Sequence, residues 1–423
     1  MYESPRGTQD ILPEDAVIWR YVESKAADQA RRFGYGELRT PTFEEAALFL
    51  RGVGEATDIV EKEIYRFQDK GGTELALRPE GTASVMRAYL EHGMASRPQP
   101  VKLYSLINAF RYNRPQAGRY REFRQFNVEV IGDADPLADA EVIAVLWRFL
   151  EELGLRNLSV LLNSIGDRVC RPAFIQALVA YYEPRRDEIC GDCQRRLATN
   201  PLRLLDCKAP RCQPIIDGAP RTLDHLCQDC QAHFTALRGY LESMDLPYQL
   251  TPRLVRGLDY YTRTVFEVVP PGGGAQSSIG GGGRYDGLAE EIGGKPTPGV
   301  GFAAGLDRII INLKQQGCPL PAPETPDVFF APLGEEAKRR ANALADQVRR
   351  LSLTAVVGMG DRSMRARLRQ AGASGARWTV ILGEDELRDE VATLKDLANG
   401  QQERVPFAEL PRRLAASLDG QAS

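Results

Sequence analysis

The chain has 423 residues, a hydrophobic content of 43% and a charged content of 26%, which is the composition of a globular protein with about two or three domains. Its net charge of −3 excludes a molecule that is basic overall and binds nucleic acid non-specifically, although a local basic face remains open. No apolar run approaches the roughly 18–20 residues of a membrane span, and the N-terminus lacks the apolar region of a secretory signal. We therefore expect a cytoplasmic protein with no membrane partner.

Helix and strand patterns alternate through the first part of the chain, and local signals mark their ends. Pro13 suits the first turn of a helix, and a hydroxyl such as that of Thr82 suits an N-cap. The predicted elements are, in order, a helix over 13–33, a hairpin with strands over 62–68 and 74–78, a helix over 82–93, strands over 101–113 and 119–131, and a helix around 137–153.

The second half of the chain changes character twice. Residues 167–240 are helical and cysteine-rich and lack the sheet pattern of their flanks, which indicates an insertion. Strand patterns return over 248–269, and a stretch with four prolines, 314–327, has the composition of a linker. We predict an α+β chain with an antiparallel or mixed sheet flanked by helices over 1–325, the insertion included, and a small α/β domain over 326–423.

One stretch of the predicted insertion, residues 190–230, holds six of the eight cysteines. Two Cys-x-x-Cys pairs, Cys190/Cys193 and Cys227/Cys230, lie at its two ends, and such pairs can hold a tetrahedral zinc ion. The alternative is that these are reduced, partly buried cysteines of a cytosolic protein. We assign no metal ligand from the sequence and leave both interpretations open.

The predicted strand over 119–131 carries unusual polarity on one face. Because side chains alternate along a strand, residues of both charges, an aromatic ring and two amides line this face. They are Arg119, Arg121, Phe123, Gln125, Asn127 and Glu129. A polar face on a central strand is costly unless it meets a ligand, whereas an edge strand with one solvated face explains it without function. The row suits a ligand with a polyphosphate, a flat base and an amine.

Other segments add charged or polar groups near turns. Arg111 precedes a loop that arginines flank on both sides, which suits a nucleotide phosphate. Glu80 and Thr82 precede a helix and suit an ammonium group, although helix capping explains them equally well. The segment "LVRGLDYYTRTVFEVV", 254–269, is a strand pattern with Arg256, Asp259 and two tyrosines at one end. Neither a Walker loop nor a dinucleotide fingerprint after a strand is present.

These segments resemble the motifs of the class II aminoacyl-tRNA synthetases. "RTPTFEE" is similar to motif 1, "FRYNRPQAGRYREFRQF" to motif 2 and "GVGFAAGLDRI" to motif 3. The segments "LRPEGTA", "LVRGLDYYTRTVFE" and "GGGRYDGL" resemble those peculiar to the histidyl-tRNA synthetases. The resemblance runs in order from residue 6 to past residue 380 and covers nearly the whole chain.

The resemblance implies activation of L-histidine with ATP and Mg²⁺ to histidyl-adenylate, then transfer of histidine to the 3′ end of tRNA-His. It implies a homodimer whose catalytic domain is a six-stranded antiparallel sheet flanked by helices, followed by an α/β anticodon-binding domain. The activation step needs no general base, because the attacking carboxylate is already ionised. It needs fixed positive charge where negative charge gathers in the transition state.

By the same resemblance, the catalytic residues are Arg111 and Arg256, which face the α-phosphate and the histidine carboxylate from opposite sides. Phe123 stacks on adenine, Arg119 holds the triphosphate, and Arg308 binds the γ-phosphate. Glu129 and Tyr261 contact the imidazole nitrogens, while Glu80, Thr82 and Gln125 receive the ammonium group. The full histidine set is Glu80, Gly81, Thr82, Arg111, Gln125, Glu129, Arg256, Tyr260, Tyr261 and Tyr285, and the ATP set is Arg111, Asn113, Arg119, Phe123 and Arg308.

Two positions depart from the family pattern: Asn113 stands where a Glu is usual, and Asp307 stands where a Glu is frequent. A different function would be that of a regulatory subunit of a short ATP phosphoribosyltransferase, which keeps the histidine pocket but lacks the anticodon-binding domain. Arg256, the intact tyrosine segment and residues 327–423 argue against it. A generic nucleotide-binding protein leaves the ordered match unexplained.

The C-terminal domain contains a basic stretch, 361–377, with five arginines and one aspartate. A solvated helix face and an RNA-facing one are equally good explanations from composition alone. We assign Arg365, Arg367 and Arg369 as candidate contacts to tRNA. The roles of Asp259 and Arg263 stay open.

Overall fold

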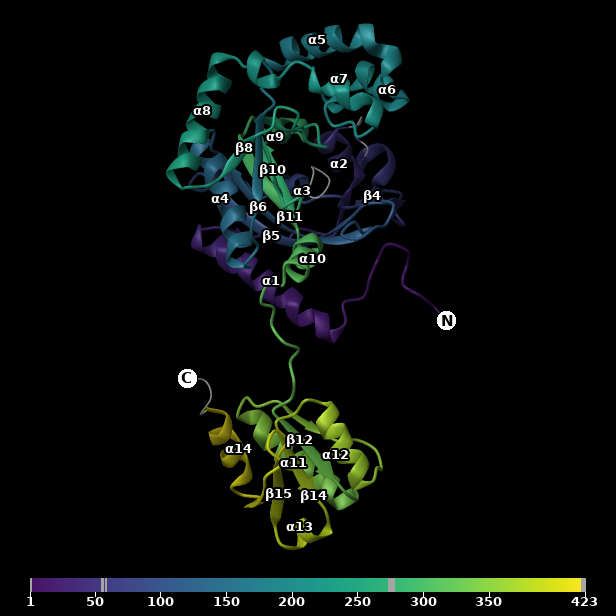
Figure 1. Ribbon diagram of the computed structural model, residues 1–423, viewed down its shortest axis with the longest axis vertical. Helices are drawn as coiled ribbons and strands as arrows, with labels where there is room; N and C mark the ends of the chain where they lie inside the picture. Colours follow the sequence, from purple (N-terminus) through teal and green to yellow (C-terminus); the bar gives the residue numbers. More distant parts are fainter. Residues whose placement is uncertain (1, 55–56, 58, 273–277, 420–423) are drawn as a thin grey trace. The chain divides into compact units, whose positions relative to one another are not determined.

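The structure is a computed structural model that describes residues 2–54, 57, 59–272 and 278–419. It divides into two compact units between Pro321 and Ala322 (Figure 1). No helix within the described ranges combines the length and the apolar content that crossing a membrane requires. Each unit has its own sheet and its own core, so each is described by itself.

The larger unit is built on a mixed sheet. Over the described residues the sheet has eight strands in the order β1-β5-β6-β11-β10-β9-β7-β8. The six strands from β5 to β7 pair antiparallel, and β1 and β8 add parallel strands at the two edges. The bounds are β1 (Gly36–Glu37), β5 (Val101–Phe110), β6 (Glu122–Ile131), β7 (Ser159–Ser164), β8 (Tyr248–Leu250), β9 (Thr262–Val269), β10 (Gly280–Arg284) and β11 (Gly299–Gly305).

One face of this sheet carries the main apolar core. Phe126, Val128 and Val130 of β6 point to this face and are buried. The ring of Phe126 packs edge-on against those of Phe149 and Phe302, with ring centres 5.2 and 5.3 Å apart. The helices that cover this face are α1 (Pro13–Arg32), α4 (Pro136–Glu152), α8 (Gln228–Ser243) and α10 (Leu306–Gln316). Because strand side chains alternate, this packing forces the polar residues of β6 to the opposite face.

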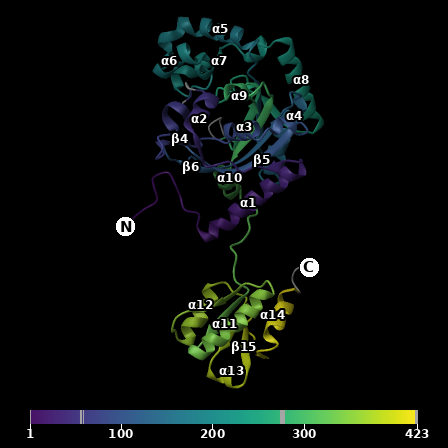
Figure 2. The ribbon, with the colours of Figure 1, turned by 180° about the vertical axis from the view of Figure 1, so that it is seen from behind.

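The opposite face is covered by smaller elements and by the insertion. They are α2 (Ala46–Val53), α3 (Thr82–Glu91), α9 (Leu288–Glu291), a small antiparallel sheet of β2 (Phe43–Glu45), β4 (Glu74–Leu77) and β3 (Arg66–Gln68), and the helices α5 (Arg171–Tyr182), α6 (Gly191–Thr199) and α7 (Gln213–Asp217). Figures 1 and 2 show α5, α6 and α7 gathered together, while α8 runs separately beside α4. The polar face of β6 therefore lies inside the unit and is not a solvated edge.

Three local expectations are corrected. Thr82 is the first residue of α3 and not its cap, because Gly81 holds the N-cap position. The segment before Thr262 is not strand, so Arg256, Asp259, Tyr260 and Tyr261 lie in an irregular segment that leads into β9. Strand β6 begins at Glu122, so Arg119 and Arg121 belong to the preceding loop.

The smaller unit has a five-stranded sheet over its described residues, in the order β13-β12-β14-β15-β16. The first three strands are parallel, as predicted for an α/β domain, and an unpredicted antiparallel hairpin completes the sheet. The strands are β12 (Val328–Pro332), β13 (Ala355–Val357), β14 (Trp378–Leu382), β15 (Val391–Asp396) and β16 (Gln402–Pro406), and the helices are α11 (Glu335–Arg350), α12 (Met364–Ala373), α13 (Glu384–Arg388) and α14 (Leu410–Asp419).

Candidate active site

The inner face of β6 holds a row of polar side chains that other residues only partly satisfy. Phe123, Gln125, Asn127 and Glu129 point to this face, and all but Phe123 are buried. Among the described residues, none forms a hydrogen bond with Oε1 of Gln125 or with either amide atom of Asn127. A buried polar atom left unpaired costs about 1–3 kcal/mol and is rare. Three unpaired buried polar atoms on neighbouring inward-facing residues of one strand indicate a ligand site.

Glu129 lies at the inner end of this row. Its carboxylate accepts a hydrogen bond from the hydroxyl of Thr82 at 2.7 Å and another from the hydroxyl of Tyr285. Burial raises the pKa of Glu129 to about 8, although both hydrogen bonds act in the opposite direction. Gly301 faces it from β11, and a Cβ atom there would overlap with the carboxylate. The backbone of β11 thus leaves room for this one side chain.

Glu80 is largely occupied by the protein itself. Its two oxygens accept hydrogen bonds from the backbone N–H groups of Thr82 at 2.7 Å and Ala83 at 2.9 Å, the first turn of α3. Tyr260 donates a third hydrogen bond at 3.4 Å. Burial raises the pKa of Glu80. Helix capping therefore accounts for Glu80, whereas Thr82 uses its hydroxyl toward Glu129.

Three tyrosines enclose the space beside the two carboxylates. The ring centres of Tyr260 and Tyr261 are 4.7 Å apart, and those of Tyr260 and Tyr285 are 5.8 Å apart at a steep angle. All three rings are buried. Gly81 adjoins them, and a Cβ there would overlap with the amide of Asn127. The structure thus brings together the predicted residues for an amino acid side chain.

Arg111 and Phe123 lie together at the outer end of the row. The guanidinium carbon of Arg111 is 5.4 Å from the ring centre of Phe123, and Nε donates to the carbonyl of Pro79 at 2.8 Å. Burial lowers the pKa of Arg111, and the positive charge of Arg256 lowers it further. An arginine keeps its positive charge even where burial and a neighbouring cation lower its pKa. The neighbouring charges of Arg111 and Arg256 therefore favour binding of an anion.

Arg256 has an internal partner that the sequence interpretation missed. Its guanidinium forms an ion pair with Glu267 of β9, and its guanidinium carbon lies 5.7 Å from the ring centre of Tyr261. The other carboxylate oxygen of Glu267 has no hydrogen-bond partner among the described residues. An acid in the middle of the apolar run "TVFEVV" was the signal that could have identified Glu267.

Arg119 and Arg308 form a second pair of neighbouring cations. Burial lowers the pKa of Arg308, and the charge of Arg119 adds to that effect. Arg308 donates to the carbonyls of Gly118 at 2.8 Å and Ser278 at 2.6 Å. Arg119 donates to Oδ1 of Asn113 at 2.7 Å and forms an ion pair with Glu63 at 3.3 Å. Asn113 therefore orients Arg119, and Glu63 was not predicted.

A cavity of about 660 Å³ opens beside these cations. Arg119 and Glu267 line it from the sheet side, and Arg203, Lys208 and Cys207 line it from the insertion. Arg263 and Asp259, whose roles the sequence left open, both have partners within the larger unit. Arg263 forms an ion pair with Asp167 at 3.4 Å, and Asp259 accepts a hydrogen bond from Asn200 at 2.9 Å.

The three candidate tRNA contacts in the smaller unit do not share one environment. Arg367 is fully buried and donates to the carbonyls of Met359 at 2.9 Å and Gly360. It holds the loop before α12 and cannot reach a surface ligand, so the prediction for Arg367 is corrected. Arg365 and Arg369 of the same helix are exposed.

Six antiparallel strands, a buried polar row on one of them and four arginines beside it match the core expected for a class II aminoacyl-tRNA synthetase. The sequence profile described as "Histidyl-tRNA synthetase" matches residues 7–183 and 209–309, and that described as "Anticodon binding domain" matches 327–417.

Individual relatives are similar along the whole chain. A histidine–tRNA ligase of Dehalococcoides mccartyi (strain ATCC BAA-2266) is 54% identical over 410 residues, which is 97% of this chain and 98% of that one. One of Desulforudis audaxviator is 50% identical over 416 residues, 98% and 99% of the two chains. The crystal structure of apo S. aureus histidyl-tRNA synthetase aligns with a TM-score of 0.82 at 37% identity and covers 98% of this chain and 100% of that one. The chain belongs to the histidyl-tRNA synthetase family.

Proposed function

We propose that the chain activates L-histidine with ATP and transfers the histidyl group to the 3′ end of tRNA-His. The observation that carries this proposal is the inner face of β6, where unpaired buried amides and a buried carboxylate lie between three tyrosines and two pairs of crowded arginines. Family membership selects histidine as the amino acid.

In the first step, an oxygen of the histidine carboxylate attacks the α-phosphorus of ATP. The bond from that phosphorus to the bridging oxygen of the β-phosphate breaks, and pyrophosphate leaves. Arg111 and Arg256 neutralise the charge that gathers as the two anions meet. Phe123 supports adenine beside Arg111, while Arg119 and Arg308 hold the outer phosphates. In the second step, a hydroxyl of the terminal ribose of tRNA attacks the histidyl carbonyl, the bond from the carbonyl carbon to the phosphate oxygen breaks, AMP leaves, and the hydroxyl proton passes to the leaving phosphate group.

Specificity for histidine comes from the closed end of the pocket. Glu129 offers an acceptor to one imidazole N–H, and Tyr261 lies among the rings that enclose it. Gln125 and Thr82 are the groups best placed for the ammonium group, because Gln125 has an unpaired oxygen and Glu80 is engaged by α3. A buried acceptor rejects analogues that lack the N–H by a factor on the order of 10⁴.

ATP enters as its Mg²⁺ complex. Oxygen donors suit Mg²⁺, and the unpaired carboxylate oxygen of Glu267 beside the cavity is such a donor. The ion would neutralise phosphate charge when bound. Glu267 then has two roles, because it also orients Arg256.

We further propose a homodimer formed through the small sheet that contains motif 1. Phe43 of β2 is 50% exposed and Phe67 of β3 is 43% exposed, and their ring centres are 6.3 Å apart. Such an apolar pair is costly in water and suits a second copy of the chain. Replacing both rings by glutamate should give monomers in sedimentation analysis, and an unchanged mass would contradict this interface.

The function is tested by aminoacylation of bulk tRNA with labelled histidine, a reaction that we expect in the cytoplasm. We expect ATP-dependent, acid-precipitable label that is released by mild base, as for an aminoacyl ester. Absence of label together with normal histidine-dependent pyrophosphate exchange would limit the function to activation. Absence of both would contradict the proposal.

A further inference from the structure

The cysteines of the insertion form two separate clusters. The pairs Cys190/Cys193 and Cys227/Cys230 do not meet each other, as a single zinc site between them would require. The first pair meets Cys207 and Cys212, and the second meets Asp167 and Cys170. In each cluster the four ligand atoms lie within 4.8 Å of one another.

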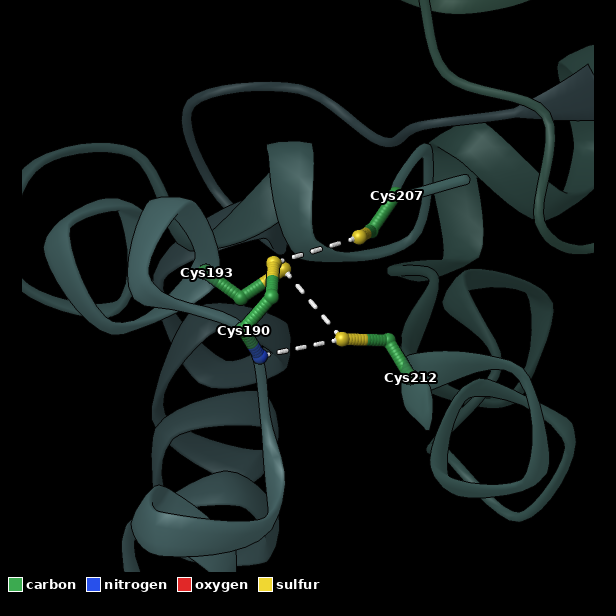
Figure 3. A group of neighbouring side chains, drawn as sticks. All are labelled: Cys190, Cys193, Cys207 and Cys212. Carbon is green, nitrogen blue, oxygen red and sulfur yellow. Dashed lines mark hydrogen bonds between the residues drawn. The ribbon is translucent and has the colours of Figure 1, made fainter. Parts of the chain in front are cut away.

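The first cluster consists of four thiols that converge from two short stretches of chain. Figure 3 shows the side chains of Cys190, Cys193, Cys207 and Cys212 pointing toward a common centre. The sulfur atoms of Cys190 and Cys207 are 3.7 Å apart, and those of Cys193 and Cys212 are 4.0 Å apart. With zinc–sulfur bonds of about 2.3 Å, the edge of a tetrahedral four-sulfur site is about 3.8 Å.

Backbone N–H groups point at two sulfur atoms of the first cluster. The backbone N–H of Cys190 donates to the sulfur of Cys212 at 3.2 Å, and that of Ala209 donates to the sulfur of Cys207 at 3.4 Å. Cys190 is also the N-cap of α6, so Cys190 and Cys193 lie at the positive end of that helix. These N–H groups can stabilise thiolate sulfurs, but they carry no positive charge to balance them, which a bound metal ion would supply.

Disulfide bonds are the competing explanation for four neighbouring cysteines. A disulfide requires sulfur atoms about 2.05 Å apart, and all cysteines of the chain are free. Pairwise oxidation would also use only two contacts, whereas the four sulfurs surround one point. Zinc prefers tetrahedral thiolate sites of this kind.

We propose that Cys190, Cys193, Cys207 and Cys212 bind one structural zinc ion. The ion ties the start of α6 to the segment that precedes α7, and so fixes one wall of the cavity beside the arginines. Cys190 and Cys207 line that wall together with Arg203 and Lys208. The ion stabilises the insertion. It has four protein ligands and no coordination position open to substrate, so it takes no part in the aminoacylation reaction.

The second cluster carries the same inference from its own geometry. The sulfurs of Cys170 and Cys230 are 3.8 Å apart, and the sulfur of Cys170 is 3.5 Å from Oδ1 of Asp167. For a zinc–oxygen bond of about 2.0 Å, the sulfur–oxygen edge of a tetrahedron is about 3.5 Å. Cys227 is the N-cap of α8, the position that Cys190 has in α6. We infer a second zinc site here, which ties α5 to α8.

The test is metal analysis of the full chain purified with a thiol reductant and without a metal-affinity step. We expect about two zinc ions per chain. The variant Cys207→Ser/Cys212→Ser should retain one, and Cys227→Ser/Cys230→Ser should also retain one. Cys318→Ser is the matched control, because Cys318 lies outside both clusters and should leave the zinc content unchanged.

A second measurement does not depend on variants that fold. Zinc is removed from the native chain with a chelator and replaced by Co²⁺, which in tetrahedral thiolate sites gives strong visible absorption and sulfur-to-metal charge transfer. Uptake of Co²⁺ with that spectrum supports the sites. A metal-free protein that takes up no Co²⁺ overturns both sites. Zinc retained in full by the Cys207→Ser/Cys212→Ser variant overturns the first. Zinc retained in full by the Cys227→Ser/Cys230→Ser variant overturns the second.

Discussion

Replacing Arg256 by alanine should damage both stability and chemistry, and the two effects can be separated. The side chains of Arg256 and Glu267 are 19% and 10% exposed, so the variant leaves a nearly buried carboxylate without its cation. Removing one partner of a buried pair costs roughly 3–5 kcal/mol, and the remaining contact with water favours a value of about 3 kcal/mol. Loss of a charge aimed at the transition state should lower kcat on the order of 10²–10³-fold.

The assays are urea unfolding and histidine-dependent ATP–pyrophosphate exchange. The double variant Arg256→Ala/Glu267→Gln also removes the unpaired negative charge of Glu267, so it should regain most of the lost stability. It should not regain exchange, because the guanidinium of Arg256 is still missing and Glu267→Gln also removes the carboxylate proposed to hold Mg²⁺; Glu267→Gln alone is the control that measures this second effect. Recovery of exchange together with stability would refute the catalytic role and leave Arg256 as a structural partner of Glu267. Near-normal exchange in the single variant would refute it as well.

Three further predictions follow from the pocket and from the smaller unit. Gly301→Ala should raise the KM for histidine on the order of 100-fold, because its Cβ would overlap with the carboxylate of Glu129 and with the backbone carbonyl of Val128, whereas Gly305→Ala, with its nearest neighbour 3.9 Å away, should not. Glu129 has a pKa of about 8 in the folded chain against about 4.3 when unfolded, so the folded state binds more protons in that window and stability should fall as pH rises through it. Glu129→Gln should flatten that fall in urea titrations. Replacing Arg365 and Arg369 by alanine should raise the KM for tRNA about tenfold and spare pyrophosphate exchange.

Each of these predictions has a control or a contradicting result. Equal KM values for the two glycine variants would show that space at β11 is not limiting. A pH slope that is the same in Glu129→Gln would assign the slope to another group. For tRNA, Arg388→Ala removes an exposed arginine elsewhere in the smaller unit, one already paired with Asp385 and Asp389, and should have little effect. Equal losses from both tRNA variants would indicate general electrostatics.

Local patterns predicted the parts of the fold that are decided locally. The helix that begins at Pro13 and the polar row on β6 follow from periodicity and end signals, which depend on near neighbours. The irregular segment that contains Arg256 does not form the predicted strand, although its two tyrosines and the threonine after them favour β structure. Its conformation is set by distant partners, among them Asn200 on Asp259.

Contacts that form only in the folded chain account for most of what the sequence did not predict. The spacing of residues along the chain does not indicate that Arg256 pairs with Glu267. It also does not indicate which residues join each Cys-x-x-Cys pair. Arg367 was indistinguishable from its neighbours on α12, because burial of one arginine depends on the loop that folds over it. Composition can count such residues, but only tertiary structure says which of them meet.

Amino acid-dependent ATP–pyrophosphate exchange, run with the purified chain and each of the twenty amino acids in turn, tests the central claim most directly. We predict exchange with histidine alone, because the closed end of the pocket offers the Glu129 carboxylate to an imidazole N–H between three tyrosine rings. Exchange with another amino acid, or none with histidine, would contradict the account.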